Sequence, residues 1–213
     1  MSRSVRRTRY AAIAGLISSP LFLTTALILS LAQSKFMRAL GWDVWPSGLA
    51  LGPYGWGQVL NFVVFGVLII AFGLGVGQAV QPGRLSWLGP LFLVVSGAGE
   101  ALAAFNTDPP NAAVSWHGQI HSVAFVVFMI SLLLGYLATL VRRDPLWRGS
   151  RRYLLLALPL LALSELPNPW GNLLFFAAML TPLQVMAIWF WRFGRGRRVG
   201  TKGEAMIEKE RNA

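Results

Sequence analysis

The stretch FNTDPPNAAVSWHGQIH, residues 105–121, is a short polar connection between two long apolar runs, 85–105 and 116–140. It holds both histidines of the chain, together with Asp108 and an adjacent pair of prolines. Each flanking run has about 20 residues, enough for a helix to cross the ~30 Å hydrocarbon core of a membrane. The stretch therefore predicts a tight turn at a membrane surface that joins two antiparallel spans.

The composition of the whole chain also fits a membrane protein. Hydrophobic residues make up 55% of the 213 positions and charged residues only 13%, about half of the ~25% found in globular proteins. We expect an all-α bundle of six transmembrane helices in a single membrane domain, residues 10–191. The expected spans are 10–31, 56–80, 85–105, 116–140, 153–166 and 171–191. A basic N-terminus (1–9) precedes the domain, and a basic tail (192–213) of low hydrophobicity, expected to be disordered, follows it.

The net charge of +11 is distributed unevenly along the chain. If six spans alternate in direction, seventeen of the 19 Lys and Arg residues lie on the side of the N-terminus, and only Lys35 and Arg38 lie opposite. This asymmetry predicts that both termini are cytoplasmic and that the protein is a multi-pass protein of the inner (plasma) membrane. The same basic clusters fit the anionic headgroups of membrane lipids as partners. The sequence shows no module that combines aromatic and basic residues, so we expect no nucleic-acid partner.

Glu100 is the most informative polar residue within a span. It lies about five residues inside the outer end of the third span, so ~7–8 Å deep at 1.5 Å per residue. A carboxylate at this depth is costly and indicates a functional group that faces the bundle interior. Asn61 lies at a similar depth in the second span, and Ser96 lies one turn below Glu100 on the same face. The alternative is a neutral Glu100 that bonds to a neighbouring helix in a structural role.

His117 and His121 are spaced i, i+4, which places both rings on one helix face, where they can share a proton or bind a metal. Two histidines do not complete a zinc site, so Glu100, Asp108 or Glu165 would have to supply a third ligand. Other interpretations stay open: a proton-handling or ligand-binding pair, or histidines that only cap and hydrate a helix end. Asp108 fits turn chemistry equally well, and Glu165 fits a simple tight connection.

We expect these groups to converge on one outward-opening cavity, because only residues 106–116 separate the third span from the fourth. The expected catalytic residues are Glu100, Asp108, His117 and His121, the expected binding residues are Asn61, Ser96 and Glu165, and the possible zinc ligands are His117, His121 and Glu100.

Two classes of function remain open from the residues alone. The first is a hydrolase for a lipid or amphiphile at the outer membrane boundary, in which histidine and Glu100 activate water directly or through zinc. The second is a non-enzymatic transporter, sensor or ligand-binding protein that uses the same vestibule for protons or a polar ligand. Cysteine is absent, which excludes a thiol nucleophile and any cysteine-based metal site.

The glycines of the third span, the Phe105-x-x-Asp108 pattern, the HGQIH heading the fourth span and Asn61 resemble one bacterial family. It is the six-span family catalogued as domain of unknown function 998. The resemblance implies a membrane location and six helices, and no established activity. A remoter likeness is to the seven-span alkaline ceramidase and progestin-receptor-like hydrolases, which bind zinc through several histidines. This chain departs from them in having six expected spans and no third histidine.

Overall fold

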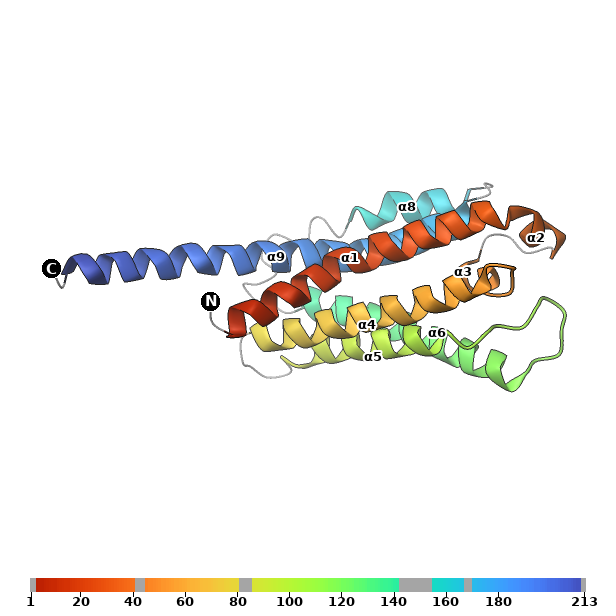
Figure 1. Ribbon diagram of the computed structural model, residues 1–213, viewed down its shortest axis with the longest axis horizontal. Helices are drawn as coiled ribbons and strands as arrows, with labels where there is room; N and C mark the ends of the chain where they lie inside the picture. Colours follow the sequence, from red (N-terminus) through yellow and green to blue (C-terminus); the bar gives the residue numbers. More distant parts are fainter. Residues whose placement is uncertain (1–2, 41–44, 81–85, 142–154, 167–169, 212–213) are drawn as a thin grey trace.

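The computed structural model describes residues 3–40, 45–80, 86–141, 155–166 and 170–211, and every regular element in these ranges is a helix (Figure 1). The prediction of an all-α fold is therefore confirmed. The helices are α1 (Arg3–Ala32), α2 (Ser34–Ala39), α3 (Pro46–Leu49), α4 (Gly55–Ala79), α5 (Leu88–Leu102), α6 (Trp116–Val141), α8 (Ala157–Ser164) and α9 (Gly171–Arg211).

Four of these helices contain segments that are long and apolar enough to cross a membrane, which makes the chain a multi-pass membrane protein. The four segments are Arg7–Ala32, Gly55–Ala79, Trp116–Ala138 and Gly171–Arg192. The other two expected spans, 85–105 and 153–166, contain shorter helices: α5 has 15 residues and α8 has 8. At 1.5 Å per residue these measure about 22 Å and 12 Å, less than a bilayer core. Six crossings therefore stay a prediction.

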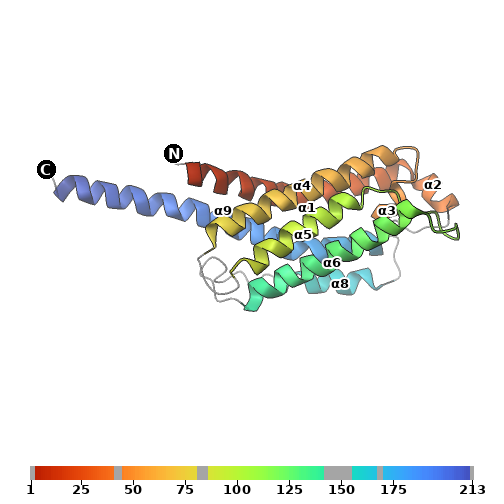
Figure 2. The same ribbon diagram turned by 90° about the horizontal axis from the view of Figure 1, so that it is seen from below.

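The C-terminal helix extends further than the sequence predicts. The last span was expected to end at residue 191 and to be followed by a disordered tail, 192–213. The structure instead continues α9 as one helix of 41 residues to Arg211, and Figures 1 and 2 show it projecting beyond the bundle. No proline follows Pro182, and the segment 204–211 is rich in strong helix formers, so α9 continues through the glycine-containing stretch 194–203 although glycine disfavours a helix.

The long helices lie side by side, with α4 between α1 and α5, α6 on the other side of α5, and α9 on α1 (Figures 1 and 2). The short α8 packs along α9. Phenylalanine rings fill the interior, and Phe22, Phe65, Phe128 and Phe176 are all buried. The rings of Phe22 and Phe65 lie 4.6 Å apart and those of Phe65 and Phe128 lie 6.2 Å apart, so aromatic packing joins α1, α4 and α6.

Glycines let α5 approach both of its neighbours closely. Gly97 faces Gly66 of α4, and Gly99 faces α6, where an added Cβ would come within 2.8 Å of the Phe128 nitrogen and 2.9 Å of the Ala124 oxygen. Small residues at such contacts are typical of helix packing in membranes. The close approach also allows the Ser96 hydroxyl to donate to the Phe128 carbonyl over 3.1 Å. The face of α5 that carries Glu100 is therefore held against the bundle interior.

We predict that Gly99→Ala lowers the free energy of unfolding in detergent by about 1–3 kcal/mol, because the added methyl forces the α6 backbone away. Gly135→Ala in the same interface is the matched control, because its Cβ would meet Phe92 Cβ and the Gly89 oxygen only at 3.5 and 3.7 Å. The control should be neutral or more stable by up to about 1 kcal/mol, since alanine favours helix. Thermal unfolding of both variants measures this. Equal losses in the two would contradict the assigned packing.

Candidate functional site

His121 connects three segments at the end of the bundle where α5 joins α6. Its Nδ1 lies 2.7 Å from the Ala103 oxygen and 2.8 Å from the Phe105 oxygen. Because carbonyl oxygens only accept hydrogen bonds, Nδ1 carries a proton and donates to them. Its Nε2 lies 3.1 Å from the Ser47 hydroxyl of α3, so the hydroxyl donates to Nε2 when the ring is neutral. The residue is 5% exposed, and its ring lies edge-on to that of Phe62 at 6.1 Å.

The end of α5 explains why a histidine is needed at this position. The last carbonyls of a helix have no partner within the helix, and a buried one must find a partner elsewhere. The α5 helix ends at Leu102, and the chain turns through Ala103 to Phe105 beneath α6. His121 supplies the donor to the carbonyls of this turn. A structural role for His121 is thus evident, whatever further role it has.

Asp108, Ser115 and His117 form a second cluster, at the start of α6. The Asp108 carboxylate accepts the backbone N–H of Ser115 at 2.8 Å and its hydroxyl at 2.6 Å. The Ser115 Oγ accepts the N–H of Gly118 at 3.1 Å, which is the bond of a helix N-cap. His117 Nδ1 donates to the Asn106 carbonyl at 3.0 Å and lies 2.8 Å from the Ser115 Oγ. This cluster ties the loop before α6 to its first turn.

The electrostatics of the cluster favour an ionised Asp108. The two hydrogen bonds from Ser115, first from its hydroxyl and then from its amide, hold the pKa of Asp108 below its ordinary value of 3.8, and the nearby His117 acts in the same direction. The His117 Nδ1 lies 3.8 Å from the carboxylate. Asp108 is therefore an acceptor that holds the loop in place over most of the pH range.

Glu100 is buried in the bundle, as the sequence predicts, and is only 1% exposed. Its Oε1 has no hydrogen-bond partner among the residues that the structure describes. Ser96 donates to Phe128, and the Asn61 amide donates to the Phe22 carbonyl at 3.1 Å and to Gln58 Oε1 at 3.3 Å, so neither donor serves Glu100. Glu100 lies three residues before Ala103, whose carbonyl accepts a hydrogen bond from His121. Three residues span about 4.5 Å along a helix axis. Glu100 therefore lies one turn deeper than the His121 link.

The structure places the predicted residues in three local environments, and their convergence on one outward-opening cavity stays a prediction. His121 and Glu100 lie in the interior, about one helical turn apart in depth. Asp108 and His117 lie at the start of α6. Glu165 is exposed at the end of α8. Within the described ranges, no three His, Cys, Asp or Glu side chains gather into a group able to hold a metal ion, so the expected set of His117, His121 and Glu100 is not assembled there.

Two residues of these clusters were not predicted. Ser115 carries a signal that could have found it, because a serine directly before an apolar helix is a preferred N-cap. Ser47 carries no such signal, since 74 positions separate it from His121.

We predict that Ser115→Ala raises the pKa of Asp108 toward its ordinary value, because both the hydroxyl donor and the cap are lost. The lowered pKa contributes stability above pH 3.8, and this contribution is lost as the pH falls through the lowered value. Carboxyl-carbon NMR of aspartate-labelled protein measures the titration, and only Asp43, Asp108 and Asp144 contribute signals. Ser122→Ala, which removes only a bond to the Gly118 carbonyl, is the control. An Asp108 titration that is unchanged in Ser115→Ala would contradict the assignment.

A comparison with known protein families identifies the family of this chain. The family model described as "Protein of unknown function (DUF998)" matches residues 16–194. No curated protein and no solved structure matches the chain. The match includes both histidine clusters and Glu100, and it confirms the resemblance to that family, whereas the likeness to alkaline ceramidase and progestin-receptor-like hydrolases finds no support. The chain belongs to the DUF998 family of membrane proteins of unknown function.

Proposed function

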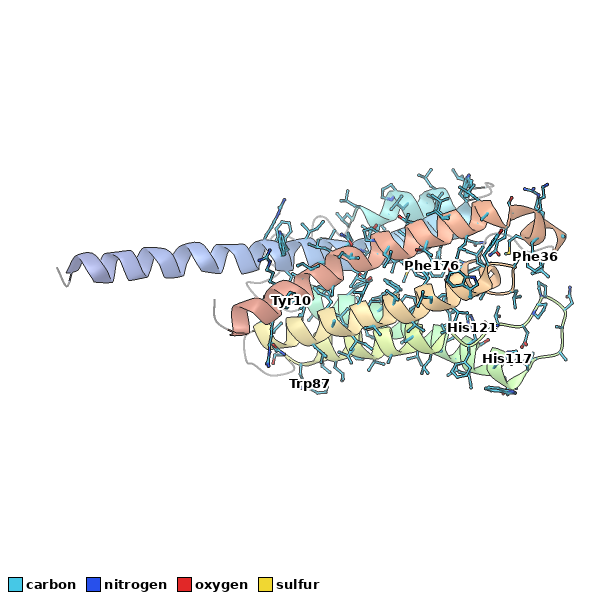
Figure 3. The ribbon with its side chains drawn as sticks, in the orientation of Figure 1. Tyr10, Phe36, Trp87, His117, His121 and Phe176 are labelled. Carbon is cyan, nitrogen blue, oxygen red and sulfur yellow. The ribbon has the colours of Figure 1, made fainter. Side chains whose placement is uncertain are left out.

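We propose that this protein is a six-span plasma-membrane protein with cytoplasmic termini, which senses protons at its outer end without catalysing a reaction. The topology is supported by the uneven distribution of Lys and Arg and by the position of the termini. The N-terminal part of α1 and the C-terminal part of α9 lie at the same end of the bundle (Figure 1). His117 and His121 lie at the opposite end, away from Tyr10 and Trp87 (Figure 3).

One observation carries the sensing function: the Glu100 carboxyl is buried and its Oε1 lacks a partner. An unpartnered buried acceptor costs about 1–3 kcal/mol, and an ionised carboxylate in apolar surroundings costs more. An apolar or amide side chain would fill the same space at a lower cost. A group retained at such a cost fits a role that only a carboxyl can perform, namely binding and releasing a proton.

The surroundings of Glu100 contain few other ionisable groups. In the described parts of α1, α4 and α9, the buried polar side chains are those of serine, asparagine and glutamine residues, none of which titrates. From α6, His121 lies one turn closer to the outer end, while Tyr136 lies fifteen residues further along this helix, beyond the Phe128 ring. A proton taken up by Glu100 or His121 would therefore change the charge of an interior that offers little compensation.

The short helix α3 is the element that would respond. It rests on His121 through Ser47, and the preceding Trp45 packs against Phe125 and Phe176 at ring distances of 6.4 and 5.8 Å. A proton on His121 Nε2 turns this nitrogen from an acceptor into a donor, so the Ser47 hydroxyl must reverse its bond. Protonation near the outer end is thus coupled to how α3 is held, which is what a proton sensor needs.

The hydrolase alternative has weaker support in the geometry. Water activation by His121 needs a free ring nitrogen, but Nδ1 donates to two carbonyls and Nε2 meets Ser47. Zinc would need three converging ligands, and within the part of the chain that the structure describes such a group is not found. The contacts of the His121 ring nitrogens therefore argue against water activation and support the sensing proposal.

For the topology, we predict that a cysteine at Ala112, in the exposed loop between α5 and α6, reacts with a membrane-impermeant maleimide in intact cells. A cysteine at Gly149, in the basic segment 142–154 that lies outside the described residues, should react only after permeabilisation. The chain has no cysteine of its own, so the background is low. The reverse labelling pattern would overturn the proposed orientation.

For the sensor, we predict that acidification of reconstituted protein produces an infrared carboxylic-acid band that is absent from Glu100→Gln. Glu165→Gln is the matched control, because Glu165 is exposed, and it should keep the band. A fluorophore on a cysteine at Leu51, just after α3, tests the His121 link separately: its emission should change on acidification, and Ser47→Ala, which removes the contact with His121, should reduce this change. Identical carboxylic-acid bands in Glu100→Gln and Glu165→Gln would rule out Glu100 as the proton-binding group.

A further inference from the structure

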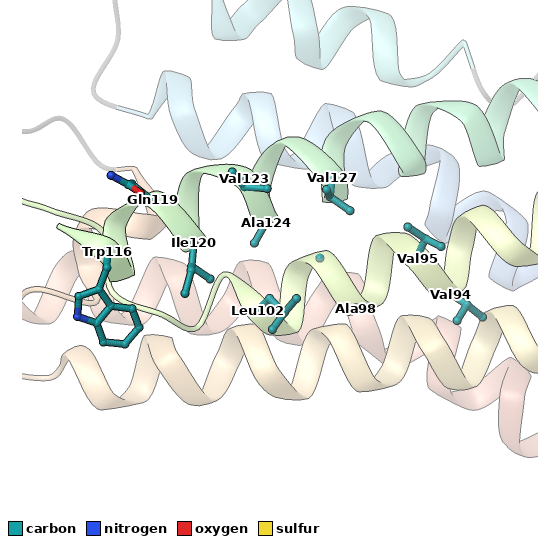
Figure 4. A pocket seen from close by; sticks show the side chains of 11 residues that line it. Val94, Val95, Ala98, Leu102, Trp116, Gln119, Ile120, Val123, Ala124 and Val127 are labelled. Carbon is teal, nitrogen blue, oxygen red and sulfur yellow. The ribbon is translucent and has the colours of Figure 1, made fainter. Parts of the chain in front are cut away.

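A groove runs between α5 and α6 on the outside of the bundle (Figure 4), and neither Glu100 nor His121 is among the residues that line it. Its volume is about 640 Å³ and its walls are aliphatic side chains of both helices, including Val94, Leu102, Ile120 and Val127. Buried Gly99 and Ala124, where the two backbones meet, form its floor.

The polar end of the groove lies at the start of α6. Gln119 is the one polar side chain in the lining, and the neighbouring Trp116 is 66% exposed. Figure 4 shows both at the same end of the groove, with Val94 at the other end. Tryptophan is enriched at membrane–water boundaries, where its indole N–H meets the headgroups. The groove therefore has an apolar length and a hydrogen-bonding mouth, which is the pattern of an amphiphile site.

We propose that this groove binds one acyl chain of an outer-leaflet phospholipid, with the headgroup oxygens at Trp116 and Gln119. The placement in the outer leaflet rests on the proposed topology. From Trp116 to Val127 the α6 wall is about 16 Å long at 1.5 Å per residue, which matches one leaflet of a ~30 Å hydrocarbon core. The indole N–H and the amide are suitable donors to ester and phosphate oxygens.

A flexible chain fits the groove better than a helix of a second copy. Helices associate in membranes through small residues on both surfaces, whereas the rims here are Val94, Val95 and Leu102 on one side and Val123 and Val127 on the other. Only the floor is small. Bulky rims above a small floor leave a narrow channel that suits a chain of methylenes.

The test uses nanodiscs that contain a phospholipid with a diazirine in the middle of one acyl chain, and mass spectrometry maps the crosslinks. We expect crosslinks at 94–102 of α5 and 120–127 of α6, and at least a tenfold loss in Ala98→Phe, which fills the groove. Val126→Phe is the matched control, because Val126 is exposed on α6 but does not line the groove. Ile120→Trp is a second filling variant, and thermal unfolding checks that each variant folds.

Three results would overturn the proposal. Equal labelling of Ala98→Phe, Ile120→Trp and the control would mean that lipid contacts here are those of any membrane surface. Chain-to-chain crosslinks at the same residues would mean that a second copy occupies the groove. Labelling by a diazirine fatty acid but not by the phospholipid would mean that the ligand is a free acid. Glu100→Gln should leave the crosslinks unchanged, so lipid binding and proton sensing can fail separately.

Discussion

The hydrogen bonds from His121 Nδ1 to the Ala103 and Phe105 carbonyls are the constraint on which the outer end depends. They satisfy the backbone where α5 stops, and they fix the ring so that Nε2 meets Ser47 of α3. Through α3 they hold Trp45 among the phenylalanines of α6 and α9. One turn deeper lies the buried carboxyl of Glu100, whose Oε1 has no partner among the described residues. The buried His121 ring therefore joins the end of α5 to α3, one turn above Glu100.

The helices were predictable where apolar length decides the outcome. The span expected at 56–80 is found as Gly55–Ala79, and the one expected at 116–140 as Trp116–Val141. Prediction from the sequence was weaker where the length of an apolar run does not determine where the helix ends. The run 85–105 carries a helix of only 15 residues, Leu88–Leu102, and at its C-terminal end the chain leaves the helix at Ala103, whose carbonyl accepts a hydrogen bond from His121. Beyond residue 191, polarity marks the end of a span but does not end a helix.

The candidate site shows the limit of spacing arguments. The depth of Glu100 followed from its position within an apolar run, and its burial is confirmed. The i, i+4 spacing places His117 and His121 on one face, but the neighbours differ along that face. His117 lies in the first turn of α6 and bonds to the preceding loop, whereas His121 meets the end of α5 and α3. Which loop covers a helix depends on contacts between distant positions, and spacing within the helix carries no information about them.

The tautomer of His121 is the most direct test of this account, because only one tautomer can donate to the two carbonyls and accept from Ser47. Nitrogen NMR of histidine-labelled protein resolves it, since the chain has two histidines and His117→Gln assigns the remaining signals. At a pH where the ring is neutral, we expect Nδ1 to be protonated and Nε2 to be bare, with the Nε2 signal shifted in Ser47→Ala. A protonated Nε2 in the neutral ring, or a Nε2 signal that Ser47→Ala leaves unchanged, would contradict the account.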